Sequence, residues 1–278
     1  MGRRIFLTAV LVACGGLPVT AGAERLPEIA IIIDDMGDRK RLGWEALQLP
    51  GPVAYAFLPD TPHGAPMAEA AWRANKEVLL HLPMDPVEAR AHPTSISAGD
   101  DQATVSERLR TALASVPKAV GVNNHQGSRV TQSRAHMDWL MGELQRLHPL
   151  YFVDSRTAGG SVAFQSARAH GIPAAKRNIF LDTDPDGAAV AEQFFRLTKR
   201  AKRYGSALAI GHPYPSTLRV LNRELRQLPA HGVKLVSPSA LIRRQLGAGP
   251  EPAGKRVRLT PSARLGTTAT LPQPRTAR

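Results

Sequence analysis

The sequence is poor in cysteine, with a single one, Cys14, among 278 residues. A lone cysteine forms no disulfide within the chain, and it leaves no CxxC redox pair and no thiolate zinc site. A Gly-x-Ser-x-Gly segment is also missing, and Gly127-Ser128 does not resemble the strand-to-helix turn that exposes a serine nucleophile. Cysteine-based catalysis is therefore excluded for the folded part, and a serine hydrolase is disfavoured.

Aromatic residues are scarce as well, at 5% of the chain. No basic stripe is interleaved with aromatic side chains, so nucleic-acid binding is not predicted despite a net charge of +13. Arg3 and Arg4 contribute +2 and residues 246–278 contribute +5, which leaves +6 on residues 5–245. This mild basic bias favours attraction to anionic envelope polymers or lipid head groups.

Long hydrophobic runs are absent, because the apolar run at residues 5–13 is too short to span a bilayer. Following two arginines, it is typical of an export signal over residues 1–23, with a cleavage site at Ala21-Gly22-Ala23. Residues 11–15 also resemble a bacterial lipobox, in which Cys14 would become a lipid anchor. Both alternatives predict an exported, periplasmic protein whose mature form has no transmembrane helix.

Between residues 26 and 245, short apolar runs alternate with helix-like segments. The runs predicted as strands are 30–33, 53–58, 78–82, 119–123, 150–153, 178–181, 207–210 and 233–236, and the predicted helices are 38–47, 65–76, 102–115, 133–147, 159–170, 186–204 and 216–230. This alternation predicts an α/β fold with a parallel sheet, as a distorted (β/α) barrel of seven or eight units. Residues 246–278, which are rich in Gly, Pro and Arg, are predicted to be a disordered basic tail.

Polar side chains collect where the predicted strands end, which is where parallel α/β proteins place their chemistry. Six strand ends carry an ionisable group, and the polar residues there are Asp34, Asp35, His81, Asn124, His125, Asp154, Ser155, Arg156, Asp182 and His212. Histidines and carboxylates without cysteine are ligands for Zn²⁺ or a similar divalent metal. Alternatively, one aspartate of the pair caps the helix predicted from residue 38 and the other is exposed.

Five blocks in order resemble the divergent polysaccharide deacetylase family, an exported bacterial branch of the polysaccharide deacetylase superfamily. They are IIIDDMG (31–37), HLPMDP (81–86), GVNNHQGSR (121–129), FVDSRT (152–157) and AIGHPYPSTL (209–218). The resemblance implies a distorted (β/α) barrel and metal-dependent removal of acetyl groups from an envelope glycan, such as peptidoglycan. It also implies that Asp34 is the catalytic base, Asp35 a metal ligand and His212 the catalytic acid.

The chain departs from the superfamily at the His-x-x-x-His metal motif, because Arg129 stands where the second histidine is expected. We therefore predict Asp35, His81 and His125 as the metal ligands. Arg156 is the expected substitute for the superfamily's base-orienting arginine. The remaining polar residues near the strand ends are expected to bind substrate: Asn124, Arg129, Asp154, Ser155 and Asp182.

The missing motif leaves a second hypothesis, in which the protein is a catalytically weak or inactive glycan-binding scaffold of the cell envelope on the same fold. The intact Asp34-Asp35 pair and His212 favour the enzyme, since a pure binder needs neither an acid nor a base. No oligomeric state is predicted from the sequence.

Overall fold

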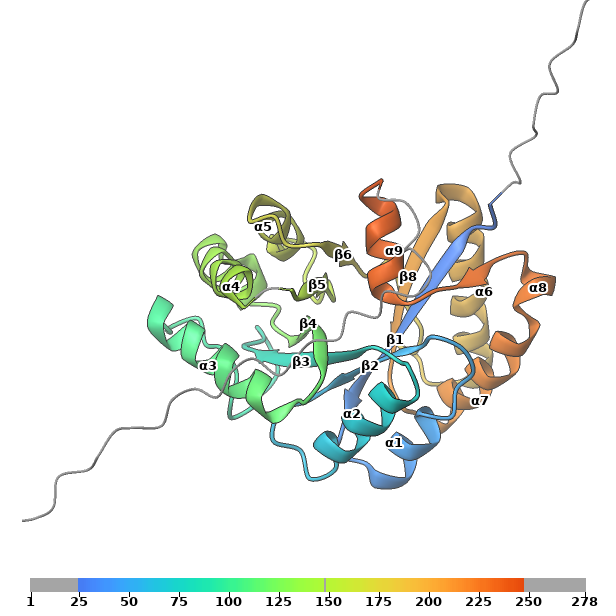
Figure 1. The fold of residues 1–278 in the computed structure, drawn as a ribbon, viewed down its shortest axis with the longest axis horizontal. Coiled ribbons are helices and arrows are strands. Elements are labelled where there is room, and N and C mark those ends of the chain that lie inside the picture. Colours follow the sequence, from blue (N-terminus) through green and yellow to red (C-terminus); the bar gives the residue numbers. More distant parts are fainter. Residues whose placement is uncertain (1–24, 148, 248–278) are drawn as a thin grey trace, which may run out of the picture.

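The computed structural model describes residues 25–147 and 149–247 of the chain, and the strands among them form one parallel sheet. The strands are β1 (Glu28–Met36), β2 (Ala54–Phe57), β3 (Val78–Met84), β4 (Ala119–Gln126), β5 (Tyr151–Asp154), β6 (Ala174–Lys176), β7 (Ile179–Phe180), β8 (Ser206–Gly211) and β9 (Lys234–Leu235). The helices are α1 (Lys40–Ala46), α2 (Gly64–Arg73), α3 (Gln102–Ser115), α4 (Arg134–Arg146), α5 (Ala163–Ala169), α6 (Gly187–Tyr204), α7 (Pro215–Glu224), α8 (Leu228–His231) and α9 (Pro238–Gln245), with short 3-10 turns at Val130–Gln132 and Leu225–Gln227. Figure 1 shows the helices arranged around the strands.

The strand order is β6-β5-β4-β3-β2-β1-β8-β7, with β9 paired to the start of β1. β6 and β7 stand at opposite ends of this order, although only Arg177 and Asn178 separate them. The Arg177 N–H donates to the Asp154 carbonyl (2.9 Å) and the Asn178 N–H donates to the Leu208 carbonyl (2.8 Å). One extended segment therefore passes from one edge of the sheet to the other, and the sheet curls into a distorted barrel.

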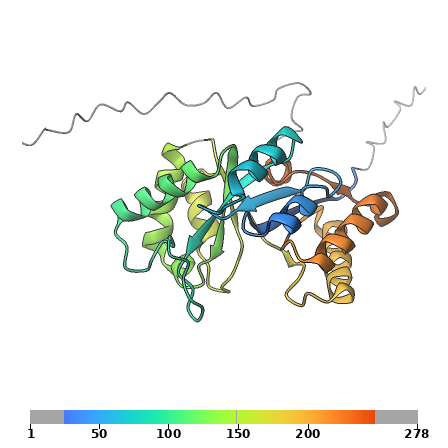
Figure 2. The same cartoon turned by 90° about the horizontal axis from the view of Figure 1, so that it is seen from below.

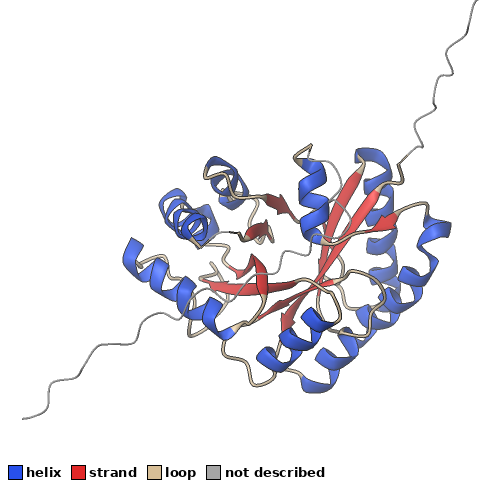
Figure 3. Ribbon diagram, in the orientation of Figure 1, coloured by secondary structure: helices blue, strands red, loops and turns tan. Residues whose placement is uncertain are grey.

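Apart from α9, the helices pack on the outside of this curled sheet, as the separation of blue helices from red strands in Figure 3 shows. In the orthogonal view, α3 and α4 (green) lie on one side and α6 and α7 (orange) on the other (Figure 2). Side-chain caps begin several helices, since Ser133 caps α4 and Asp186 caps α6. α6 ends at Gly205, whose φ of +82° is the left-handed conformation that glycine adopts at low cost.

The two faces of β1 explain why the core has two layers. Side chains alternate along a strand, so Ile29, Ile31 and Ile33 pack against the outer helices while Ala30 and Ile32 face the barrel interior. Small and large apolar side chains fill the interior, and α9 closes its base with two buried apolar residues. This inner cluster includes Ala30, Ala54, Ala56, Ala175, Leu241 and Ile242.

The predicted α/β fold and its distorted (β/α) barrel are confirmed. Two elements were not predicted: β6, which is only three residues long, and α9, which follows the last predicted strand. Both are too short to show a hydrophobic period. The predicted signal and its Cys14, and nearly all of the predicted tail, lie outside the described residues.

Candidate metal and acid–base site

The adjacent carboxylates end β1 in an irregular conformation. Asp34 continues the inward alternation of Ala30 and Ile32, and it is almost fully buried. Asp35 has a φ of +52°, and the pairing register with β2 shifts between Ile33 and Met36. A bulge of this kind redirects a side chain. Asp35 therefore turns toward the same histidines as Asp34, whereas a regular strand would send the two carboxylates to opposite faces.

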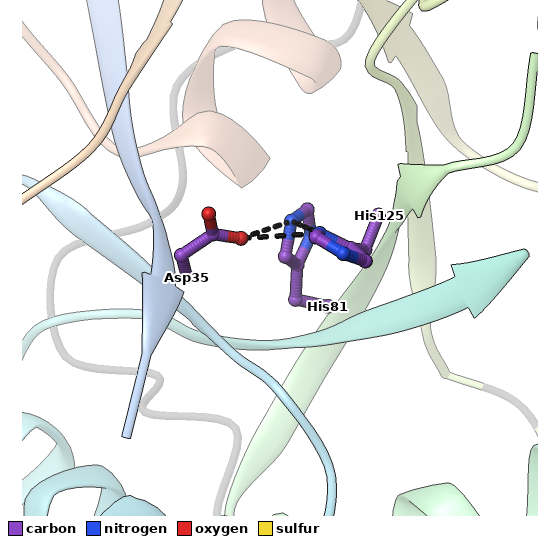
Figure 4. Close-up of side chains that lie close together, drawn as sticks. All are labelled: Asp35, His81 and His125. Atoms are coloured by element: carbon purple, nitrogen blue, oxygen red, sulfur yellow. Dashed lines mark hydrogen bonds and ion pairs between the residues drawn. The ribbon is translucent and has the colours of Figure 1, made fainter. Parts of the chain in front are cut away.

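Two histidines from neighbouring strands meet Asp35, as Figure 4 shows. His81 lies on β3 and His125 on β4, and the pairing of Pro83 with His125 brings them to the same end of the sheet. Asp35 Oδ1 lies 3.2 Å from His81 Nε2 and 3.1 Å from His125 Nδ1, and the two nitrogens are 3.2 Å apart. Three potential ligand atoms thus form a nearly equilateral triangle.

This triangle fits a metal ion. Metal bonds of about 2.0–2.1 Å in a tetrahedral site place neighbouring ligand atoms about 3.3 Å apart, close to the separations observed here. Asp35 Oδ1 is buried, and it faces the two ring nitrogens with no other hydrogen-bond partner in the described part of the chain. A buried carboxylate oxygen is costly in free energy unless a cation or a donor satisfies it. The Asp35 side chain retains 37% of its exposure and that of His125 retains 20%, so the site has an open side for further ligands.

Asn123 connects the metal triangle to Asp34. Its Oδ1 lies 2.9 Å from His81 Nδ1, and its Nδ2 donates to both carboxylate oxygens of Asp34 at 2.9 and 3.0 Å. A donor at His81 Nδ1 leaves the Nε2 lone pair free to point at the position between His125 and Asp35. Asn123 is fully buried, so these bonds hold both side chains in place.

His212 follows β8 on the other side of Asp35, with Nε2 3.7 Å from Asp35 Oδ2. Its Nδ1 lies 3.0 Å from Asp182 Oδ1, and its backbone N–H donates to Asp182 Oδ2 at 2.6 Å. The hydroxyl of Thr217 donates to the same Oδ2 at 2.8 Å. Asp182 therefore orients the imidazole so that its Nε2 faces the metal triangle.

The family of this chain follows from comparison with known sequences. The model of the divergent polysaccharide deacetylase family matches residues 31–242. The chain belongs to this family. The uncharacterized protein YibQ of Escherichia coli strain K12 is 38% identical over 241 residues, covering 86% of this chain and 73% of YibQ. An uncharacterized protein from Haemophilus influenzae strain Rd is 37% identical over 226 residues, covering 81% of this chain and 80% of that protein.

A solved structure supports the fold of this family member. The crystal structure of uncharacterized protein ATU2773 from Agrobacterium tumefaciens C58 superposes with a TM-score of 0.75 at 22% identity. The superposition covers 79% of this chain and 91% of ATU2773. ATU2773 thus shares the barrel of this chain.

Burial and charge separate the protonation states of the site. Burial raises the pKa of Asp34 and outweighs the opposing charges of His81 and His212, and the Asp35 charge adds a smaller rise. Burial would also raise the pKa of Asp35, but its contacts with His125 and His81 outweigh burial and hold that pKa well below its ordinary range. For His212, burial is outweighed by the hydrogen bond and charge of Asp182, which raise its pKa to about 9.

Several residues predicted to bind substrate are engaged elsewhere. Asn124 donates to the Gln126 carbonyl and accepts from the Ser155 N–H, so it joins two strand ends. The Asp154 carboxylate accepts from the Arg156 N–H and from a loop hydroxyl. The Arg129 guanidinium donates to the carbonyls of Pro86 and Val87 at 3.3 Å. These contacts tie loops together beside the site, and the predicted substrate roles remain predictions.

Two residues near the site were not predicted, Asn123 and Arg177. Asn123 could have been found by alternation, because it faces the same side of β4 as His125, whereas Asn124 faces the opposite side. Arg177 donates to the carbonyls of Ser155 (2.6 Å) and Arg156 (2.9 Å), and its guanidinium lies 4.6 Å from the ring centre of Phe180. No sequence motif marks this arginine, since its position depends on how the barrel closes.

The helix-cap alternative for the Asp pair is wrong. α1 begins after Arg39, and no side-chain cap hydrogen bond is present at that position. Among the described residues, no helix is both long enough and apolar enough to cross a bilayer.

Proposed function

We propose that this protein is a metal-dependent hydrolase that removes acetyl groups from a polysaccharide or peptidoglycan-type glycan of the cell envelope. The observation that carries the proposal is the placement of Asp35, His81 and His125 around one point, flanked by Asp34 and His212. Membership of the divergent polysaccharide deacetylase family supports the glycan as substrate.

Asp35, His81 and His125 would hold Zn²⁺ or a similar divalent metal, with Asn123 fixing the tautomer of His81. A metal bound there would polarise the acetyl carbonyl and lower the pKa of a water molecule toward 7. Neutral imidazoles and an ionised carboxylate are the required ligand states, and the depressed pKa of Asp35 supplies the latter.

Asp34 and His212 divide the proton transfers. Asp34 accepts a proton from the water molecule as the water oxygen bonds to the acetyl carbon. The raised pKa of Asp34 lies closer to the working pH, as suits a general base. His212, protonated below a pKa of about 9, donates its Nε2 proton to the leaving amine or hydroxyl as the carbon–nitrogen or carbon–oxygen bond breaks. Acetate and the deacetylated sugar are the products.

Asp182 and Asn123 act as positioning residues in this scheme, on His212 and Asp34 respectively. Arg177 joins the end of β5 to Phe180, whose ring lies 5.3 Å from that of His212. Arg177 therefore holds the segment next to His212 against the end of β5, at the junction between β6 and β7. Arg156, Ser155 and Arg129 remain candidates for contact with the glycan.

The test combines metal analysis with acetate release from N- and O-acetylated glycans. Asp35→Ala should lose the metal, whereas Asp34→Asn and His212→Ala should retain it and lose about 10²–10⁴-fold in turnover. Asp38→Ala is a matched control, because Asp38 is an exposed acid next to the site that contacts none of its ligands.

Full metal occupancy in the Asp35→Ala variant would refute the ligand assignment. Saturable glycan binding with no acetate release from metal-loaded wild type would instead favour the non-catalytic scaffold. We further propose that the protein is exported to the periplasm. Cleavage after Ala23 and lipidation at Cys14 predict different mature N-termini, which intact mass measurement distinguishes.

A further inference from the structure

The charge of the described chain is strongly asymmetric along the sequence. Residues 187–245 contain eleven lysines and arginines against two glutamates, a net charge of +9. Residues 25–186 contain 17 basic and 19 acidic residues, a net charge of −2. The positive charge of the folded part therefore belongs to its last quarter, which comprises α6 to α9 with strands β8 and β9.

Four chain segments from this region and from the N-terminus meet at the amino ends of the strands. The Glu28 N–H donates to the Gly205 carbonyl (3.0 Å), and the Lys234 N–H donates to the Pro27 carbonyl (2.8 Å). At the end of α9, Arg244 pairs with Glu28 at 3.0 Å, and the next residue donates to Ser206. The beginning of β1 thus lies between the ends of α6 and α9, at the base of the barrel (Figure 1).

Exposed apolar side chains gather at this base. Leu26 is 54% exposed, Tyr204 is 58% exposed and Leu246 is 43% exposed. They are three of the seven large apolar side chains that are exposed in the described part of the chain. Each flanks one of the hydrogen-bonded segments, so they belong to one end of the molecule.

Exposed cations lie on the same segments as these apolar groups. Lys202 and Arg203 occupy the last turn of α6, and Lys234 begins β9. The Arg203 guanidinium lies 5.2 Å from the ring centre of Tyr204. The helix dipole accounts for cations at the end of α6, but it does not account for three large apolar side chains held in water beside them.

We propose that this basal face, defined as Leu26, Lys202, Arg203, Tyr204, Lys234 and Leu246, docks on the surface of an anionic lipid bilayer. Cations attract anionic head groups, and apolar or aromatic side chains enter the interfacial layer; together they are the chemistry of peripheral membrane binding. A bilayer suits this face because its apolar groups project from separate segments around the base of the barrel. The cations alone would suit an acidic glycan equally well. The exposed apolar side chains favour the bilayer, because they can enter its interfacial layer.

Docking in this orientation has a consequence for the candidate active site. Asp34 and His212 follow the carboxyl ends of β1 and β8, whereas the basal face lies at the amino ends of the same strands. The bilayer would therefore lie on the side of the barrel away from the metal triangle. The site would remain open to a glycan located beyond the membrane surface.

The experiment is flotation of the full chain with vesicles of phosphatidylcholine, with and without phosphatidylglycerol, over a range of salt concentrations. We expect binding that requires phosphatidylglycerol and weakens as salt screens the charges. Since each basic residue at a membrane surface contributes about a fivefold factor in affinity, Lys202→Gln/Lys234→Gln should weaken binding by roughly ten- to thirtyfold. Tyr204→Ala should weaken it further.

Matched controls come from the same chain, so that whatever residues 1–24 and 248–278 contribute is common to all variants. Arg90→Gln/Arg219→Gln removes two exposed cations elsewhere. Phe195→Ala removes an aromatic side chain that is 61% exposed on α6, nine residues before Tyr204. Both controls should bind like wild type, and circular dichroism should show that every variant is folded.

Equal vesicle binding by wild type and the Lys202→Gln/Lys234→Gln variant would overturn the proposal. It would also be overturned if Arg90→Gln/Arg219→Gln weakened vesicle binding as much as Lys202→Gln/Lys234→Gln does. Binding to an acidic polysaccharide such as polygalacturonate, with the same dependence on Lys202 and Lys234 but without vesicle binding, would also overturn it. That outcome would identify the basal face as a glycan-binding surface.

Discussion

Asn123 offers the sharpest test of the site, because one amide serves two functions. Its Oδ1 orients His81, and its Nδ2 donates two hydrogen bonds to the buried Asp34 carboxylate. Asn123→Ala removes both, leaving His81 Nδ1 and Asp34 without these partners. Loss of a group that orients a metal ligand typically costs 10–100-fold in metal affinity, and hydrogen bonds to a charged group contribute about 1.5–3 kcal/mol each.

Asn123→Asp separates the two functions. The aspartate keeps an acceptor for His81 Nδ1 but places a second negative charge about 3 Å from Asp34, where the wild-type amide lies 2.9 Å away. We expect metal affinity close to that of wild type and a further rise in the pKa of Asp34, since like charges disfavour ionisation. A carboxyl that stays protonated at the working pH cannot accept a proton from water, so turnover should fall while metal binding persists.

The assay is competition for Zn²⁺ with a chromophoric chelator, followed by acetate release from the metal-loaded protein. Ser155→Ala is the control for the metal competition, because it removes only the 3.3 Å contact between the Asn123 amide and the Ser155 hydroxyl. Wild-type metal affinity in Asn123→Ala would refute the role of this amide in holding His81. Full turnover in Asn123→Asp would refute the assignment of Asp34 as the base.

Three further perturbations address the acid, the departure from the metal motif and the stability. Asp182→Asn removes the interaction that raises the pKa of His212 to about 9, so the imidazolium should lose its proton at lower pH; NMR titration and the basic limb of the rate profile should shift together. Arg129→Ala should leave metal affinity unchanged while making residues 85–100 more sensitive to protease, and loss of metal would contradict the ligand set. Hydrogen bonding to Arg110 lowers the pKa of Glu143 in the folded protein. The ionised Glu143 therefore stabilises the fold at pH values above 4.5, its ordinary pKa, and this stabilisation is lost as the pH falls through the lowered pKa. In Glu143→Gln, the free energy of unfolding measured by urea titration should fall less steeply as the pH is lowered. The same pH dependence in wild type and variant would contradict this explanation.

Much of the site could be predicted because parallel strands deliver their last residues to one rim. Asp34, Asp35, His81, His125 and His212 were selected by that rule, and the structure brings all five together. The same rule also selected Asn124 and Asp154, whose side chains point to the outer face of the sheet and not to the barrel interior. Strict application of the two-residue alternation would have replaced Asn124 with Asn123.

Other features depend on geometry that no local pattern encodes. The bulge at Asp35 arises where the pairing of β1 with β2 loses register, and a period-two pattern cannot show it. Arg177 reaches the site because β6 and β7 join the two edges of the sheet, so its role depends on barrel closure. The basal face combines residues more than two hundred positions apart, such as Leu26 and Leu246.

The sequence by itself determined the alternation of strands and helices, the rim to which the carboxylates and histidines belong, and the absence of cysteine chemistry in the fold. These features follow from hydrophobic period and residue type, which are local properties. Only the tertiary structure decided that both carboxylates turn toward His81, that one Asp35 oxygen lies 3.2 Å from His81 and 3.1 Å from His125, and that Asn123 connects His81 to Asp34. Those results depend on register, twist and closure, which arise when distant strands pair.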